Sequence, residues 1–406
     1  MKTIPLAISV LGFAVLTAGC PGTNVPPADF SVSDLYLAGG ADDGVLAYSY
    51  GVTTYAADGT SGSTLTARVR GIGVATDPSQ YVSLDFADSG TVSGMVTTQG
   101  NLWLQTRDTK KKIVVTHVSG DPHVRDSEKT ISTANGALSG TLSADRSTKV
   151  RVVVDGRGLT PDDQEAIEIF NDPSDQGSTI VPGGLKNQNY LTAYSPNDDL
   201  TALASTERIT DCDDNDPKRH RPTACAPGSV VVVNDVSGAT VVGGSFEGAP
   251  LAVWSDGKNT AVLSLRNDST TALTTNAGVV AGPLVPGDAC TAMAFDSDGT
   301  GYVLVVTQEA VTVTTLARGK AAVSDVVSAR TASPSPLTQG QCAIRMKTTT
   351  GIGGLPATLA RQVAWVEDGD EAPASAIVVS VTDAHTGEYR LKTKHDTVKN
   401  SINNVR

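Results

Sequence analysis

The segment best suited to chemistry is an acidic run between two cysteines, DCDDNDPKRHRPTAC at residues 211–225. Asp211, Asp213 and Asn215 stand at alternate positions, and Asp216 adds a further side-chain oxygen. A hard cation such as Ca²⁺ takes about six to eight oxygen ligands, and the first ligands of calcium loops have this alternating spacing. The segment therefore predicts a calcium site, and the sequence suggests no other cofactor.

The amino-acid sequence of this segment resembles the metal-binding repeat of exported bacterial proteins related to MopE. The resemblance is close over DCDDNDP, residues 211–217, and implies a bound metal ion. It weakens afterwards, where Lys218, Arg219 and Arg221 bring positive charges. Because these cations can neutralise the carboxylates, a salt-bridged loop without metal stays open as an alternative.

Besides Cys20, the chain has an even number of cysteines, which fits an exported protein in an oxidising compartment. Several pairings are formally allowed. We expect neighbours to pair, because each neighbouring pair lies within one half-unit of the strand pattern. The expected disulfides are Cys212–Cys225 and Cys290–Cys342.

The N-terminus has the pattern of an export signal, with Lys2, an apolar run over residues 4–16 and small residues before Cys20. A run of about a dozen residues is too short to span a bilayer core of about 30 Å. Residues 16–20, LTAGC, resemble the lipobox of bacterial lipoproteins, although Thr17 stands where Leu is preferred. The resemblance implies cleavage before Cys20 and attachment of fatty acids such as palmitate to that residue. The alternative is an ordinary secretory signal.

An anchor of several acyl chains would hold the protein firmly to a membrane. Pro21 follows the cysteine in place of the Asp that favours inner-membrane retention, so we expect the outer membrane or cell surface. The chain then divides into a signal peptide (1–19), an acylated Cys20 with a flexible tether up to 32, a body (33–395) and a polar tail (396–406).

The composition of the body favours an all-β fold. Aromatic residues make up 4% and charged residues 18% of the chain, and short runs rich in Val, Thr and Tyr alternate with turn residues. One helix is expected at LTPDDQEAIEIF, residues 159–170, where Thr160 can cap and Pro161 suits the first turn.

A strand, an acidic Asp-Gly turn and an apolar strand recur at 251–267, 291–308 and 361–383. Asp-Gly between apolar runs is a strong hairpin signal. One unit per roughly 40 to 60 residues fits the body, and periods of about 40 to 50 residues with several strands per unit are typical of propeller blades. The chain thus resembles a divergent bacterial β-propeller of about six or seven blades. The alternative is two β-sandwiches divided at the acidic segment.

Other residues that could do chemistry are better explained by structure. Asp256, Asp298 and Asp368 stand beside turn glycines and are expected to form the turns through their own side chains. We expect packing roles for the three tryptophans, Trp103, Trp254 and Trp365. We expect no catalytic residue, because the motifs of hydrolase elbows, zinc proteases and nucleotide-binding loops are missing from the sequence.

A formal net charge of -12 and scattered basic residues exclude a typical nucleic-acid-binding protein. The sequence predicts a non-enzymatic, lipid-anchored envelope protein whose β-rich body binds or scaffolds. Its partners would be the membrane and an envelope protein or glycan. Two alternatives stay open: a propeller hydrolase or lyase acting on an exported polymer, and a structural subunit of an envelope assembly.

Overall fold

A computed structural model shows the fold of most of the body. It describes the residue ranges 29–38, 45–56, 59–71, 84–86, 91–98, 101–107, 113–118, 125–131, 137–144, 150–156, 166–170, 178–181, 188–197, 199–207, 227–330, 336–349, 358–368, 375–382 and 387–392. Within these ranges there are 28 strands and no helix. Accordingly, no helix in the described part of the chain could cross a membrane.

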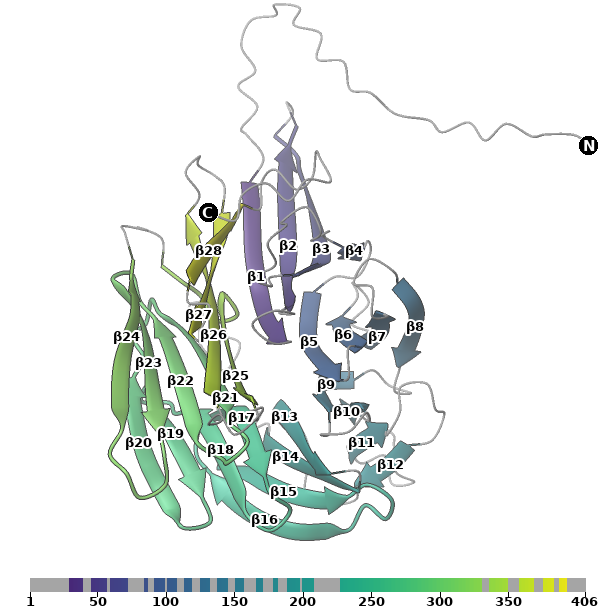
Figure 1. The fold of residues 1–406 in the computed structure, drawn as a ribbon. Coiled ribbons are helices and arrows are strands. Elements are labelled where there is room, and N and C mark those ends of the chain that lie inside the picture. The colour runs from purple at the N-terminus through teal and green to yellow at the C-terminus, as the bar shows by residue number, and fades with distance from the viewer. Residues whose placement is uncertain are drawn as a thin grey trace, which may run out of the picture.

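The described strands form seven antiparallel sheets of four consecutive strands each, which we call blades 1 to 7 (Figure 1). Blade 1 contains β1 (Asp29–Ala38), β2 (Val45–Tyr55), β3 (Ser61–Gly71) and β4 (Leu84–Phe86). Blade 2 contains β5 (Thr91–Thr98), β6 (Asn101–Arg107), β7 (Ile113–Val118) and β8 (Arg125–Ile131). Blade 3 contains β9 (Ala137–Ala144), β10 (Val150–Gly156), β11 (Ala166–Phe170) and β12 (Ser178–Val181).

The second half continues the same order. Blade 4 contains β13 (Gln188–Asn197), β14 (Leu200–Glu207), β15 (Gly228–Asn234) and β16 (Thr240–Phe246). Blade 5 contains β17 (Ala249–Ser255), β18 (Thr260–Leu265), β19 (Thr270–Thr275) and β20 (Gly278–Leu284). Blade 6 contains β21 (Cys290–Phe295), β22 (Gly301–Val306), β23 (Ala310–Leu316) and β24 (Val323–Ala329). Blade 7 contains β25 (Cys342–Thr349), β26 (Thr358–Asp368), β27 (Ser375–Thr382) and β28 (Gly387–Lys392).

The blades close into a ring. The first strand of each blade contacts the first strand of the next, and β25 of blade 7 contacts β1 of blade 1 (Figure 1). The fourth strand of each blade forms the outer edge of its sheet. This arrangement confirms the propeller-like prediction, gives seven blades within the described residues, and excludes the pair of sandwiches.

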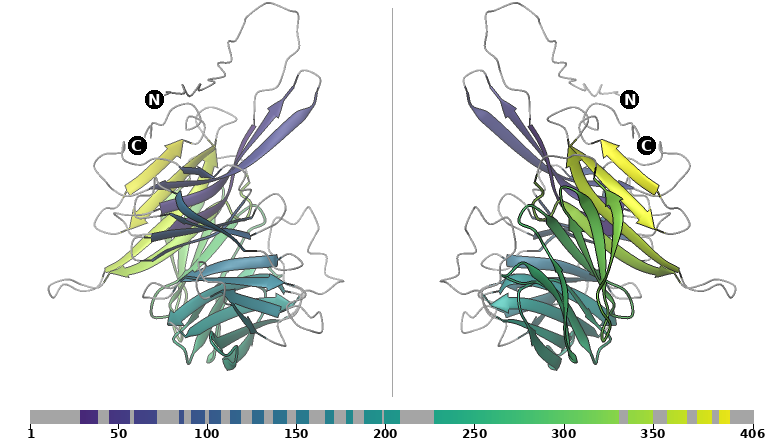
Figure 2. Two further views of the ribbon diagram at one scale, coloured as in Figure 1. Left: turned by 90° about the vertical axis from the view of Figure 1, so that its right-hand side faces the viewer. Right: turned by 90° about the vertical axis from the view of Figure 1, so that its left-hand side faces the viewer.

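Burial follows the radial position of a strand. Every residue of β18 and of β22 is buried, whereas most residues of the outer strand β16 are exposed. An inner strand is covered by blades on both faces, so its sequence is mostly apolar, as in TAVLSL. Blade 1 has a further feature, because the tip of its long β2–β3 hairpin projects beyond the ring (Figure 2).

The prediction of a helix at residues 159–170 is wrong for residues 166–170, the part of this segment that the structure describes. Residues 166–170 form the strand β11. Ile167 and Ile169 are both fully buried, and Glu168 between them is only half-buried. The period of two suits a strand, and pairing with β10 and β12 overrides the helix-start signals upstream.

The third repeat is a hairpin, as predicted, but it occupies a different place in its blade from the first two. The segments 251–267 and 291–308 each contain the first hairpin of a blade, β17–β18 and β21–β22. The segment 361–383 instead contains β26–β27, the second hairpin of blade 7. Because the same turn chemistry serves both kinds of hairpin, the sequence pattern alone does not distinguish them.

The ring is closed between blades 7 and 1 by a bulge in β1. Its register against β2 shifts between Ser33 and Tyr36, and Asp34 has a φ of 52°. The bulge lets the backbone N–H of Leu35 donate a hydrogen bond to the carbonyl of Gly340, at 2.8 Å. Gly340 lies just before β25, so this bond joins the first blade to the last.

Side chains reinforce this closure. Gln341 Nε2 donates a hydrogen bond to the carbonyl of Val32, at 3.1 Å. A cluster of buried apolar residues also extends through blades 6, 7 and 1; it includes Val32, Leu46, Tyr48, Leu304, Val313, Ile344, Val363 and Trp365. The seam is therefore held by packing and by two hydrogen bonds rather than by a shared sheet.

We expect Gly340→Ala to destabilise the ring more than Gly319→Ala. Both glycines have positive φ, at 86° and 70°, which costs a non-glycine residue about 1 kcal/mol. A Cβ at Gly340 would also lie 3.1 Å from the backbone nitrogen of Asp34, whereas one at Gly319 would have nothing within 4 Å. Urea unfolding should give losses of about 2 and 1 kcal/mol, respectively. Equal losses would show that the closing contact contributes little.

Candidate functional site

The residues of the predicted calcium and lipidation sites lie outside the described residues, so both sites stay predictions. The acidic segment is placed within the fold, because it joins Glu207 at the end of β14 to Gly228 at the start of β15. It therefore interrupts blade 4 between its second and third strands. The residues concerned are Cys20, Asp211, Cys212, Asp213, Asn215, Asp216 and Cys225.

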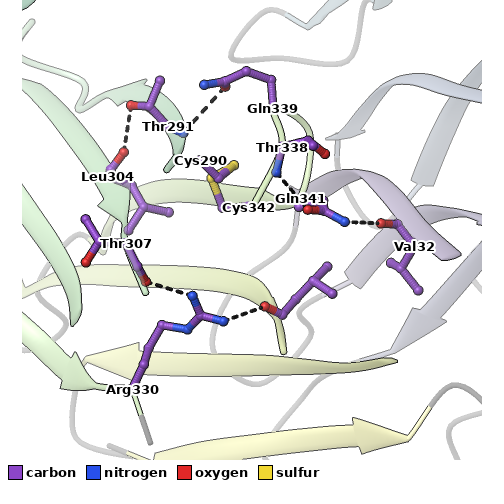
Figure 3. The surroundings of a disulfide bond; sticks show 11 residues. Val32, Cys290, Thr291, Leu304, Thr307, Arg330, Thr338, Gln339, Gln341 and Cys342 are labelled. Carbon is purple, nitrogen blue, oxygen red and sulfur yellow. Dashed lines mark hydrogen bonds between the residues drawn. A yellow bond between two sulfur atoms is a disulfide. The ribbon is translucent and has the colours of Figure 1, made fainter. Parts of the chain in front are cut away.

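The predicted disulfide between Cys290 and Cys342 is confirmed (Figure 3). It links β21 to β25, the innermost strands of blades 6 and 7, and both cysteines are buried. Next to it, Thr291 donates through its backbone N–H to Gln339 Oε1, at 3.4 Å, and through its hydroxyl to the carbonyl of Leu304, at 2.8 Å. The bond acts as a staple between neighbouring blades.

A buried cation lies on the same seam. Arg330, which follows β24, donates hydrogen bonds to the carbonyls of Thr307 in blade 6, at 2.7 Å, and Val366 in blade 7, at 3.3 Å (Figure 3). Its Nε lies 3.6 Å from Glu367 Oε1. The same carboxylate oxygen accepts a hydrogen bond from Trp365 Nε1, at 2.8 Å. The guanidinium therefore joins two blades rather than facing a ligand.

A second buried ion pair joins blades 3 and 4. Arg151 in β10 pairs with Asp235, which follows β15, and also donates to the carbonyl of Asn197 at 3.0 Å. Burial raises the pKa of the Asp235 carboxyl, while the charge of Arg151 acts in the opposite direction. The backbone carbonyl of Asp235 accepts a further hydrogen bond from Thr179 in blade 3.

Sequence reasoning missed both arginines. A usable signal exists for Arg151, which interrupts the valine-rich run VRVVVD, since a charged residue inside an apolar strand needs a buried partner. The partner itself, Asp235, lies 84 residues away in sequence. Only the ring places the two side chains together.

The prediction that turn aspartates form their own turns is confirmed for Asp256 and Asp298, whereas the turn after Asp368 lies outside the described residues. Asp256 Oδ1 accepts hydrogen bonds from the backbone N–H groups of Lys258 and Asn259, at 2.8 and 2.7 Å. Asp298 Oδ1 accepts one from Thr300, at 2.8 Å. Hydrogen bonds, first of all from Asn259, hold the pKa of Asp256 below its usual range.

These turns also affect a tyrosine in blade 6. Burial, followed by the negative charges of Asp296 and Asp298, raises the pKa of Tyr302 to about 12. The charge of Arg361 in blade 7 acts in the opposite direction. The phenol therefore stays protonated at neutral pH and contributes to packing, since Tyr302 belongs to the core cluster of the closing seam.

The tryptophans have packing roles, as predicted. Trp365 is fully buried. Trp254 donates through Nε1 to the carbonyl of Ser297 in the next blade, at 3.3 Å, and its ring lies against Gly299, where a Cβ would approach it to 3.0 Å. Trp103 stacks on His117 with ring centroids 4.5 Å apart. Their rings contact protein groups within or between blades.

Within the described ranges, the side chains that commonly bind metals do not gather into a metal site. In particular, the residues described include no group of three or more His, Cys, Asp or Glu side chains that could hold a metal ion. The charged side chains that are buried on the two seams bind one another and backbone carbonyls across the blades. Their arrangement supports the ring.

The best candidate for a binding surface is an apolar outer wall on blades 4, 5 and 6. Five large apolar side chains on the outermost strands β16, β20 and β24 are between 53% and 70% exposed. They are Val241, Val279, Leu284, Val323 and Val326. Neither β16 nor β20 contains a charged residue, whereas the outer strands β8 and β28 contain several. Sequence reasoning missed this wall, although the uncharged runs TVVGGSF and GVVAGPL could have signalled it.

Comparison with known proteins finds no matching family model and no matching curated protein. Among solved structures, the chain resembles an acylaminoacyl peptidase from Pyrococcus horikoshii, with a TM-score of 0.46 and 9% identity over 89% of this chain and 52% of that one. This chain thus spans about half the length of the peptidase. It also resembles a fucose-specific lectin from Aleuria aurantia, with a TM-score of 0.39 and 10% identity over 73% and 92% of the two chains. Likenesses this distant indicate no function.

We expect Cys290→Ala/Cys342→Ala to lower the free energy of unfolding by about 4 kcal/mol, because the bond closes a long loop in the unfolded chain. The two cysteines are 52 residues apart. Urea unfolding of the wild type and the double variant would measure the difference. With reductant present, the two proteins should become nearly equal, since neither then has the cross-link. A difference that persists under reduction would assign the loss to packing rather than to the disulfide.

Proposed function

We propose that this chain is a lipid-anchored protein of the outer membrane or cell surface, whose propeller body binds other envelope molecules without catalysing a reaction. The observation that carries the proposal is the exposed apolar outer wall of blades 4 to 6. Exposed apolar side chains that form a patch mark interaction sites, and the five of this wall lie on the outer strands of three consecutive blades. The partner would be an envelope protein or a glycan.

The start of the fold is compatible with an anchor at Cys20. The described part of the chain begins at Asp29, the first residue of β1. A fully extended chain spans at most about 3.3 to 3.6 Å per residue, so the intervening segment would reach about 30 Å. Acylation of Cys20 would therefore hold the ring close to the membrane and to partners confined there.

The buried charges support a binding role over a catalytic one. Arg151 and Arg330 are the most obvious candidates for a charged site, and each contacts main-chain carbonyls in a neighbouring blade. Such contacts fix the blades relative to one another. A catalytic acid, base or electrostatic stabiliser must instead reach the reacting atoms.

Replacing the lipidated residue tests the anchor. The wild-type protein should sediment with membranes and dissolve in detergent, and Cys20→Ser should leave the membrane, because stable anchoring requires the acyl chains. Cys342→Ala, which removes a cysteine far from the lipobox, should remain on the membrane. Mass spectrometry of the N-terminal peptide checks the modification directly. A Cys20→Ser protein that still sediments with membranes would contradict the anchor.

We further propose that Ca²⁺ binds the acidic segment at residues 211–225 and stabilises blade 4. The support comes from the sequence, in which Asp211, Asp213, Asn215 and Asp216 supply hard oxygen ligands. The two cysteines of the segment would close it into a short loop. An ion bound there would restrain a long connection between β14 and β15.

Thermal unfolding with Ca²⁺ and with a chelator tests this site. A ligand that binds only the native state must raise the midpoint, so Ca²⁺ should stabilise the wild type and not Asp213→Ala. Asp256→Ala is the matched control, because Asp256 forms a turn in blade 5 and should not affect the response. A wild-type midpoint that is the same in Ca²⁺ and in chelator would remove the calcium site.

A further inference from the structure

Among the outer strands of the ring, only β16 and the four-residue β12 contain neither a charged residue nor a proline within their bounds, and β16 is the longer of the two. Its sequence, TVVGGSF, has neither a charged residue nor a proline, and only Phe246 is buried. By contrast, β20 contains Pro283 and β24 contains Asp325. Exposed edge strands are usually protected by charges, prolines or coverage, since their free backbone groups can pair with another strand. β16 lacks charged and proline residues along its whole length.

Two adjacent glycines in β16 are only partly explained by the packing of the chain itself. Neither Gly243 nor Gly244 has a positive φ. A Cβ at Gly243 would meet only the carbonyl oxygen of Val230, at 3.9 Å, and one at Gly244 would meet a methyl group of Val230 at 3.3 Å. Glycine in a strand costs about 0.5 to 1 kcal/mol relative to alanine, and it often marks a place where another backbone approaches closely.

We propose that β16 pairs with β16 of a second copy of this chain, in antiparallel register about Gly243. This register places Val241 opposite Ser245 of the second copy, and Val242 opposite Gly244 of the second copy. Each larger side chain then faces a small one, so the strand is complementary to itself. The two blade 4 sheets would become one continuous sheet across a two-fold axis, which is the commonest symmetry of homo-oligomers.

The charge of the chain favours contact at this strand. With a net charge of -12, two copies repel each other through most of their surface. β16 carries no charge, and pairing there would cover the exposed Val241. The inference rests on the proposed function in one respect: it takes a second copy of the chain as the partner that binds the β16 part of the outer wall. A shared membrane would raise the local concentration of the copies.

The association is measured on the mature chain carrying Cys20→Ser, so that the anchor plays no part. Sedimentation equilibrium should show a monomer–dimer equilibrium, and Val241→Lys should weaken the dimer at least about tenfold, because each copy would bury a cation at the interface. Val279→Lys is the matched control: it places the same charge at an equally exposed position on β20 and should leave the dimer intact. Circular dichroism verifies that both variants are folded.

The register has its own test. Residues directly opposite each other in an antiparallel pair have Cα atoms about 4.5 to 5.5 Å apart, within the range of a disulfide. Gly243→Cys should therefore form a covalent dimer on mild oxidation, and Val279→Cys should not. A monomer at every concentration, a dimer that Val241→Lys leaves unchanged, or equal cross-linking at both positions would overturn the proposal. Membrane fractionation of the acylated protein reports separately on the proposed function, so the two can fail independently.

Discussion

Closure of the ring between its first and last blades is the constraint on which the rest of the structure depends. Every blade is built from four consecutive strands, so no described sheet holds strands from both ends of the body. The ring is closed instead by the bond from Leu35 to Gly340, by Gln341 and by the shared apolar cluster. The bulge at Asp34 is the local distortion that brings Leu35 into reach. Because neighbouring blades support each other all the way round, opening this seam would leave two apolar faces exposed.

The buried ion pairs and the disulfide have related effects on the seams between blades. A buried ion pair adds little net stability, because desolvation offsets the attraction between its charges. Arg151 and Arg330 instead require a particular alignment, since each must reach backbone carbonyls in the neighbouring blade. Apolar faces alone would tolerate small rotations between blades. The charged pairs select one arrangement, and the bond between Cys290 and Cys342 fixes it covalently on the seam next to the closing one.

The hairpins and the fold class are predictable from the sequence because they depend on residues close together in the chain. Features that depend on contacts between distant segments are not predictable in this way. Asp256 and Asp298 build their turns from hydrogen bonds within a few residues, so their roles were clear in advance. The sequence predicts a helix at residues 166–170 because helix-start signals precede them. Their apolar side chains recur with the period of two of a strand, and pairing with β10 and β12 makes this segment a strand. The outer wall was missed for a similar reason. Whether TVVGGSF is covered or exposed depends on its place as the fourth strand of a blade, which nothing within the run itself specifies.

The position of β16 relative to the start of the chain allows anchoring and pairing at the same time. β1, where the described chain begins, lies in blade 1, and blades 2 and 3 separate it from blade 4 on one side of the ring (Figure 1). The strands β1 and β16 therefore lie in different parts of the ring. An uncharged edge strand risks uncontrolled aggregation in a soluble protein, but β24 and β28 carry charged residues, and Pro283 in β20 lacks a backbone donor. Of the four outer strands β16, β20, β24 and β28, only β16 contains neither a charged residue nor a proline, which favours one defined contact over indiscriminate stacking.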